Sequence, residues 1–290
     1  ELSGEVEIEE KNDSEKSAPH QLTLTATPIP RTLSMSVYAN MDVSVIDELP
    51  PGRKPIQTSC LPLSRKDKLI ERILAATQQG SKVYWICPLI EESENLDLNA
   101  VMETYEDLSE HFSHEKVGCL HGKLSANKKQ DQIQAFKDSQ TSVLVSTTVV
   151  EVGVDIPDAD IMVIENAERF GLAQLHQLRG RIGRGTKESY CILLHKDKIQ
   201  DISSQRLQVL VDSQDGFKIA EEDLVIRGPG EIMGAQQTGI VPMKYTNLVR
   251  DSQYLMETKK VAESICNDDP ELANQLIERW ISGSIAFADA

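Results

Sequence analysis

Short apolar runs rich in valine and isoleucine alternate along the chain with longer stretches of helical periodicity. Five of these runs predict buried strands, at 82–87, 116–120, 142–146, 161–164 and 190–194. The stretches around them predict helices at about 65–79, 97–113, 125–138 and 171–182, with Ser125 as the N-cap of the third. This alternation predicts an α/β fold, in which a parallel sheet is covered by helices on both faces. Function is expected at the ends of its strands.

The pattern before this region is shorter and more broken. Residues 23–27 predict a strand that ends at a Pro-Ile-Pro turn, and residues 31–38 predict a helix. A second strand is predicted over 42–46. It runs into Pro50-Pro51-Gly52, and such a proline and glycine breaker is typical of a linker.

After residue 200 the strand pattern fades, and the chain becomes mostly helical. Helical patterns predominate at about 201–212, 217–225 and 246–282. Arg227-Gly228-Pro229-Gly230 predicts a loop between the second and third of them. The expected architecture is therefore an α/β sheet domain followed by a helical extension.

Composition and charge limit the classes of function. The 290 residues are 40% hydrophobic and 26% charged, which is typical of a soluble globular chain, and no apolar run is long enough to span a membrane. The net charge of −16 argues against nucleic-acid binding by the whole surface, so any such contact must come from a local basic region. Residues 1–16 hold seven of the acids and predict a solvated, poorly ordered arm.

The cysteines point to a reducing, cytoplasmic setting. Their number, five, is odd, they are widely spaced, and no C-x-x-C pair occurs. Neither a zinc site nor a disulfide framework is therefore suggested, and no metal site is expected in this chain.

The strongest candidate for chemistry is Gln177-Leu178-Arg179-Gly180-Arg181-Ile182-Gly183-Arg184-Gly185. On a helix, Gln177, Arg181 and Arg184 would share one stripe, and Gly180 beside it would let another surface come close. Two guanidiniums on one rigid element can clamp a polyphosphate, since each holds two oxygens. Taken alone, the same pattern fits an exposed basic helix.

Three further signals precede this segment, and each alone has an ordinary structural explanation. Thr25-Ala26-Thr27 stands before a proline turn and is consistent with a turn cap. His121 ends a predicted strand, where a histidine is usually structural although a ligand-facing group is also well placed there. The stretch from Ser146 to Asp155 ends another strand, and Asp155 is consistent with a turn cap.

In this order, the four signals resemble the later motifs of superfamily 2 helicases. Thr25 and Thr27 resemble the motif that couples nucleotide state to strand binding, the stretch from Thr147 to Asp155 the fifth motif, and Gln177-x-x-Gly180-Arg181-x-x-Arg184 the sixth. The resemblance implies a second recA-like lobe, whose arginines reach the γ-phosphate on the first lobe. It implies arginine fingers at Arg181 and Arg184. Implied residues of the nucleotide cleft are Gln177, Gly153, Asp155 and Gly180.

The resemblance narrows to the RecG family of bacterial helicases, which remodel stalled replication forks. It rests on 25–33, 42–53 and 85–94 and extends over roughly residues 20–285. The stretch 215–237 is similar to a translocation motif that this family shares with the transcription-repair coupling factor, although a Pro/Gly-rich surface turn would look alike. The implied nucleic-acid-binding or coupling residues are Thr25, Thr27, His121, Thr147, Arg206, Arg227 and Gln237.

Several parts of such a motor are not in this sequence. There is no G-x-x-x-x-G-K-[ST] phosphate loop and no D-E-x-H run before Thr25. By resemblance, ATP and Mg²⁺ would be held mainly by a first lobe outside this chain, so the isolated chain is expected to be inactive. The implied partners are branched double-stranded DNA and the first lobe and wedge domain of the same polypeptide, with no membrane.

The resemblance also implies boundaries. They are an acidic arm at 1–20, the end of the first lobe and the interlobe linker at 21–52, the second lobe at 53–200, and a translocation hairpin, loop and C-terminal helices at 201–290. Two alternatives stay open: a translocase of the coupling-factor type, or a nucleic-acid or partner-binding module that has lost its motor.

Overall fold

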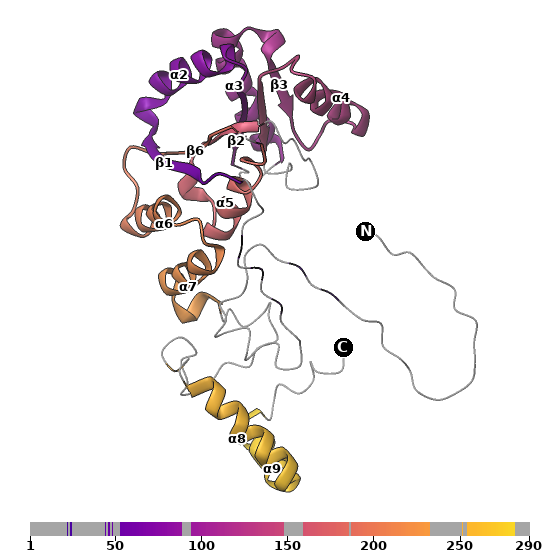
Figure 1. Cartoon of the computed structure of the whole chain (residues 1–290), viewed down its shortest axis with the longest axis vertical. Coiled ribbons are helices and arrows are strands. Elements are labelled where there is room, and N and C mark those ends of the chain that lie inside the picture. The colour runs from indigo at the N-terminus through magenta and orange to yellow at the C-terminus, as the bar shows by residue number, and fades with distance from the viewer. Residues whose placement is uncertain are drawn as a thin grey trace, which may run out of the picture.

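The computed structural model describes residues 53–88, 94–147, 159–185, 187–232, 251 and 254–281, with the single residues Leu22, Leu24, Ser44, Ile46 and Glu48. Within these ranges a six-stranded parallel sheet has the order β1-β6-β5-β2-β4-β3. The sheet stands above the C-terminal helices in Figure 1. Its strands are β1 Ile56–Pro62, β2 Lys82–Cys87, β3 Val117–Leu120, β4 Val143–Thr147, β5 Ala159–Ile164 and β6 Ser189–His195.

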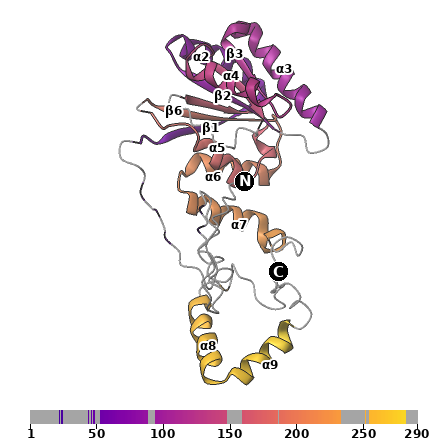
Figure 2. The same cartoon turned by 90° about the vertical axis from the view of Figure 1, so that its right-hand side faces the viewer.

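Helices cover both faces of the sheet. The helices α2 (Lys66–Gln78) and α3 (Glu94–Phe112) pack on one face, and α4 (Ala126–Lys137), α5 (Leu172–Arg179) and α6 (Asp201–Asp212) pack on the other. Figure 2 shows α2 and α3 on one side of the strands and α5 and α6 on the other. Short 3-10 helices lie at η1 Leu63–Arg65, η2 His114–Lys116 and η4 Ala167–Arg169.

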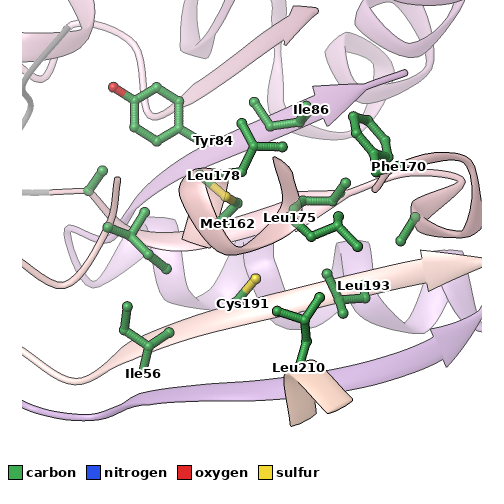
Figure 3. Close-up of a cluster of buried hydrophobic side chains, with 14 of the residues drawn as sticks. Ile56, Tyr84, Ile86, Met162, Phe170, Leu175, Leu178, Cys191, Leu193 and Leu210 are labelled. Atoms are coloured by element: carbon green, nitrogen blue, oxygen red, sulfur yellow. The ribbon is translucent and has the colours of Figure 1, made fainter. Parts of the chain in front are cut away.

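The central strand β2 explains why the sheet needs both helical layers. Every residue of β2 is buried, and it pairs with β4 and β5. Because successive side chains of a strand point to opposite faces, Val83, Trp85 and Cys87 join the core beneath α2 and α3. Tyr84 and Ile86 join the other core, which Figure 3 shows between the strands, α5 and α6.

In the part of the chain that the structure describes, four helices follow the sheet. After α6, α7 (Gly216–Ile232) packs against α5 and α6. The last two, α8 (Leu255–Asp268) and α9 (Pro270–Ile281), pack against each other. Asp269 caps α9 by accepting the backbone N–H of Leu272 at 3.0 Å, and Pro270 occupies the first helical position, where its missing N–H costs nothing. No helix within the described ranges is long and apolar enough to cross a membrane.

The predicted fold class is confirmed, and so are the five predicted strands. The predicted N-cap is also confirmed, because Ser125 Oγ accepts the Lys128 N–H at 3.4 Å. β1 was not predicted. It is an edge strand in which only Ile56 is buried, so its sequence lacks the continuous apolar run of the inner strands.

Two predictions about helices are wrong. The helix predicted over 171–182 ends at Arg179, as described below. The loop predicted at 227–230 is part of α7, whose backbone stays helical to Ile232. An interior proline removes one helical hydrogen bond and its ring opposes the carbonyl of the residue four positions earlier, which is why Pro229 and the neighbouring glycines predicted a loop. Of the helical pattern predicted over 246–282, the structure describes 251 and 254–281, which contain α8 and α9 with Asp269 between them.

The predicted elements before residue 53 are mostly outside the described residues. The helix at 31–38 lies entirely outside them. Of the strands predicted over 23–27 and 42–46, the structure describes only Leu24, Ser44 and Ile46. These three residues are exposed and belong to no helix or strand.

The packing of Phe136 yields a stability prediction. Phe136 of α4 is fully buried, and its ring centroid lies 5.2 Å from that of Tyr84. Phe136→Ala is expected to lower the free energy of unfolding by about 3–5 kcal/mol, because it removes buried contacts and leaves a cavity that the surrounding structure fills only in part. Urea denaturation of the chain measures this loss.

The matched control is Val225→Ala on α7, because Val225 is 63% exposed. That change is expected to stay within about 0.5 kcal/mol. Equal losses in the two variants would contradict the assignment of Phe136 to the core.

Candidate functional site

The arginine segment leaves its helix earlier than the sequence pattern predicts. α5 ends at Arg179, and Gly180 is its C-cap. The backbone N–H of Arg181 donates to the Leu178 carbonyl at 2.9 Å, which closes a tight turn. Arg181 and Arg184 therefore lie in a loop, here called the arginine loop (residues 180–185), and the prediction that they share a helical stripe with Gln177 is wrong.

Gly183 is the physical reason for this loop. Its φ is +72°, a conformation that L side chains rarely adopt. A Cβ at this position would stand 3.0 Å from Ile56 Cγ1 and 3.5 Å from Ser189 Oγ. Ile56 and Ser189 are the first residues of β1 and β6 and pair with each other. The glycine thus lets the loop turn out of α5 and pack at the amino edge of the sheet.

Arg53, which precedes β1, contacts the backbone of the arginine loop. Its Nη2 donates to the carbonyl oxygens of Gly180 at 3.2 Å and Ile182 at 3.3 Å. These carbonyls stand on either side of Arg181. Gly180 was expected to let another surface come close, and the group that contacts its backbone is the guanidinium of Arg53. The sequence pattern contained no sign of this contact.

The buried Arg179 stabilises the same region from the end of α5, a role that was not predicted from the sequence. It is 3% exposed, and its Nη1 donates to the carbonyl oxygens of Leu210 at 2.6 Å and Ser213 at 2.9 Å and to Thr58 Oγ1 at 3.3 Å. Burial lowers the pKa of its guanidinium. The Arg179 guanidinium lies at the carboxyl end of α6, where the helix dipole is negative.

The two guanidiniums next to the tight turn differ in environment from Arg179. Arg184 is exposed and Arg181 is half-buried, and Gln177 is exposed in the last turn of α5. The amino edge therefore carries several cationic donors close in sequence, which suit a polyphosphate. Within the described ranges no group of three or more His, Cys, Asp or Glu side chains could hold a metal ion.

His121 and Thr147 lie at the opposite, carboxyl edge of the sheet. Leu120 of β3 pairs with Ser146 of β4, so the next residues, His121 and Thr147, are neighbours across the two strands. Thr147 is 2% exposed, and its Oγ1 has no hydrogen-bond partner within the described part of the chain. The same holds for the buried Nδ1 of His121. Two buried polar atoms near this edge thus have no hydrogen-bond partner within the described part of the chain.

The charge around His121 is positive. Burial lowers the pKa of His121, and the nearby charges of Lys129 and Lys123 lower it further. The amino end of α4 lies in the same region, and its dipole adds partial positive charge. Lys123 and Lys128 are exposed there. This carboxyl-edge surface is consequently suited to an anion.

The position of α5 explains why the predicted site residues divide between two edges. α5 follows β5 and runs back across the sheet, so its end reaches the amino edge. Function was expected at strand ends, and His121 and Thr147 are at the carboxyl ends of their strands. The arginine loop is instead at the amino edge.

Arg206 lies on α6 and binds the backbone of η4. Its Nη2 donates to the Glu168 carbonyl oxygen at 2.8 Å, which holds α6 against the turn that precedes α5. The other predicted residues are beyond what the structure describes. Thr25, Thr27, Gly153, Asp155 and Gln237 lie outside the described residues, and Arg227 lies on α7 with its side chain undescribed.

Comparison with known proteins matches two segments of the chain to helicase domains. Residues 65–186 match the helicase conserved C-terminal domain, and residues 213–279 match the C-terminal part of domain 3 of ATP-dependent DNA helicase RecG. The chain is 50% identical over 276 residues to ATP-dependent DNA helicase RecG of Pasteurella multocida. It is 48% identical over 282 residues to that of Escherichia coli K12.

These alignments cover 95% and 97% of the chain but 40% and 41% of the relatives, so the chain spans about two fifths of their length. A solved structure of RecG bound to a three-way DNA junction is also similar, with a TM-score of 0.62 and 44% identity. That match covers 79% of this chain and 30% of the solved chain. The predicted resemblance and fold are both confirmed.

The contact between Arg179 and His176 predicts a pH dependence of stability. Arg179 Nη2 lies 3.0 Å from His176 Nδ1, which can accept its hydrogen bond only when the imidazole is neutral. Burial, and then the charge of Arg179, lower the pKa of His176 to about 4. Unfolded histidine has a pKa of about 6.5, so the unfolded chain binds more protons between these values. Stability is therefore expected to fall as pH drops from about 6.5 to 4.

His176→Gln removes this titration while keeping an acceptor for Arg179. Urea unfolding of the chain between pH 6.5 and 4 is expected to show a shallower pH dependence in this variant. His114→Gln, at an exposed position, is the control and should keep the original slope. An unchanged slope in His176→Gln would contradict the prediction.

Proposed function

This chain corresponds to the C-terminal part of the RecG family of ATP-dependent DNA helicases, and we propose that it forms the second motor lobe of a translocase that remodels branched DNA. The observation that carries the proposal is the arginine loop, which Gly183 and Arg53 fix at one edge of the sheet. A loop held in this way can present cationic groups to a ligand on a facing lobe. We assign the lobe to 53–200 and the translocation element to 201–290.

The amino edge is the proposed nucleotide side. ATP, when bound with Mg²⁺, supplies the phosphoryl transfer that drives the motor, and both are held mainly by the first lobe. The guanidiniums of Arg181 and Arg184 would donate to phosphate oxygens and stabilise the charge that develops during the transfer. Gln177, Gly180, Gly153 and Asp155 are the proposed lining of the same cleft.

The carboxyl edge is the proposed DNA side. The amino end of α4, with Lys123, Lys128 and Lys129 nearby, favours phosphate groups. His121 lies beside this surface, at the carboxyl end of β3, and is proposed to contribute to it. A local basic surface of this kind is compatible with the overall charge of −16.

Coupling between the two edges is proposed to run through α6 and α7. Arg206 binds η4, immediately before α5, and the arginine loop follows α5 directly. Arg227 and Gln237 are the proposed loop residues that convert lobe closure into movement along the duplex, with Thr25 and Thr27 acting from the first lobe. The partners are branched DNA and the first lobe and wedge domain of the same polypeptide.

The two alternatives are less well supported. The match of residues 213–279 to domain 3 of RecG favours that family over a coupling-factor type of translocase. A binding module without a motor would not need the arginine loop to be held by both a glycine and an arginine. The free thiols of all five cysteines are compatible with the reducing cytoplasm, where we place the protein.

ATP hydrolysis tests the nucleotide side. The isolated chain is expected to show no DNA-stimulated hydrolysis above that of an Arg181→Ala, Arg184→Ala variant. In the complete helicase, Arg184→Ala should lower kcat by about 10³- to 10⁵-fold, the usual effect of an arginine finger. Steady-state kinetics measure this, with Arg72→Ala on the exposed surface of α2 as the control. Wild-type turnover in Arg184→Ala would overturn the assignment.

Salt-dependent DNA binding tests the carboxyl edge. Lys123→Ala with Lys128→Ala in the complete helicase should weaken binding to forked DNA. The slope of log K against log salt should fall by about one for each lysine lost. Fluorescence anisotropy at several salt concentrations measures the slope. Lys68→Ala, on α2 at the other face of the sheet, is the control, and an equal effect there would contradict the assignment.

A further inference from the structure

We propose that Arg53 is a positioning residue for the arginine loop, and that it ties the interlobe linker to the group that completes the nucleotide site. The inference rests on the proposed function of Arg181 and Arg184. Arg53 follows the Pro50-Pro51-Gly52 breaker and precedes β1 by three residues. It therefore stands where the predicted linker enters the lobe.

The contact of Arg53 is with backbone and not with a carboxylate. A single nitrogen, Nη2, bridges the carbonyl oxygens of Gly180 and Ile182, 3.2 and 3.3 Å away. Both hydrogen bonds are partly buried, and the bridged carbonyls flank Arg181 in the chain. The bridge fixes the direction of the peptide units on both sides of Arg181, and so restricts where its side chain can point.

Other contacts of the loop depend on the same short stretch of chain. Gly183 packs against Ile56, the third residue after Arg53, and the Arg181 N–H completes a turn on Leu178. The outer side of the loop is thus held by Arg53 and Ile56 together. A shift of the linker end relative to β1 would alter the bridge to Gly180 and Ile182.

Substituting a residue that positions a catalytic group changes turnover more than binding. This difference distinguishes a positioning role of Arg53 from a general role in stability. Arg53→Met keeps a long side chain and removes both hydrogen bonds. In the complete helicase it should lower kcat for DNA-dependent ATP hydrolysis by about 10- to 100-fold, as small misplacements of catalytic groups do. The KM for ATP and the Kd for forked DNA should stay within about two-fold, because the bridge touches neither ligand in this assignment.

Two further variants control for side-chain chemistry. Arg53→Lys keeps a cationic donor on a shorter stem and should recover much of the lost kcat. Arg72→Met on α2 makes the same chemical change at an exposed position and should leave kcat unchanged. A kcat loss as large in Arg53→Lys as in Arg53→Met, or as large in Arg72→Met, would overturn the inference.

Combining Arg53→Met with the Arg181→Ala, Arg184→Ala variant separates this inference from the proposed function. If Arg53 acts through the loop, Arg53→Met should cause little further loss in an Arg181→Ala, Arg184→Ala background. A full additional loss would show that Arg53 acts elsewhere and would overturn the inference. Wild-type turnover in the Arg181→Ala, Arg184→Ala protein overturns the proposed catalytic role itself. Loss in that protein with full activity in Arg53→Met overturns only the inference.

Hydrogen exchange gives a readout that does not depend on activity. In the isolated chain, Arg53→Met should speed amide exchange in the arginine loop while the strands β2, β4 and β5 keep their protection. Unchanged exchange of the loop would contradict the bridge. Faster exchange in the strands as well would indicate unfolding of the lobe and would also overturn a positioning role.

Discussion

A buried guanidinium without a described carboxylate partner joins the sheet domain to the helices that follow it. Transfer of a charge out of water costs several kcal/mol, so Arg179 is tolerated only because α6, β1 and His176 surround it with acceptors. Two of those acceptors, the carbonyl oxygens of Leu210 and Ser213, belong to the end of α6 and would lose this partner if Arg179 were removed. The end of α5, the end of α6 and the entrance to α7 are therefore fixed as one unit. The arginine loop begins at the next residue.

The parallel sheet accounts for the separation of the two proposed surfaces. Each crossover returns the chain to the amino edge, so the loop that ends α5 cannot lie beside the ends of β3 and β4. His121 and Thr147 are held at the carboxyl edge by pairing of those strands, while Gly183 packs the arginine loop against β1. A lobe built this way can face a nucleotide and a DNA backbone at once, with a rigid sheet between them.

The sequence predicted the inner strands well, because strands buried on both faces consist of continuous apolar runs. β1 was not predicted, because an edge strand with one buried residue lacks such a run and its sequence resembles that of a loop. The chemistry predicted for the arginine segment stays a prediction, and its predicted geometry is wrong. The stripe argument assumed that the helix continued, whereas Gly183 has a positive φ that only the fold requires.

The missed arginines differ in whether any pattern could have revealed them. Leu172, Leu175 and Arg179 follow helical spacing, so Arg179 is on the buried face of α5 and was detectable. Arg53 was not detectable, because its acceptors are backbone carbonyls 127 and 129 residues away. Every residue has a backbone carbonyl, so a hydrogen bond to a carbonyl does not depend on residue type and cannot be recognised from the sequence.

Under the proposed function, arginine has two distinct tasks in this lobe, and the partner of each guanidinium distinguishes them. Arg53, Arg179 and Arg206 bind carbonyl oxygens of the fold, where the fixed fork of a guanidinium satisfies backbone acceptors that a lysine would reach with less geometric control. Arg181 and Arg184 stand between these anchors in a loop whose backbone is fixed on both sides. An arginine finger needs this combination, because its charge stabilises a transition state only if it is already in place when the phosphate transfer begins. The arginines that bind the fold thus favour the catalytic role proposed for Arg181 and Arg184.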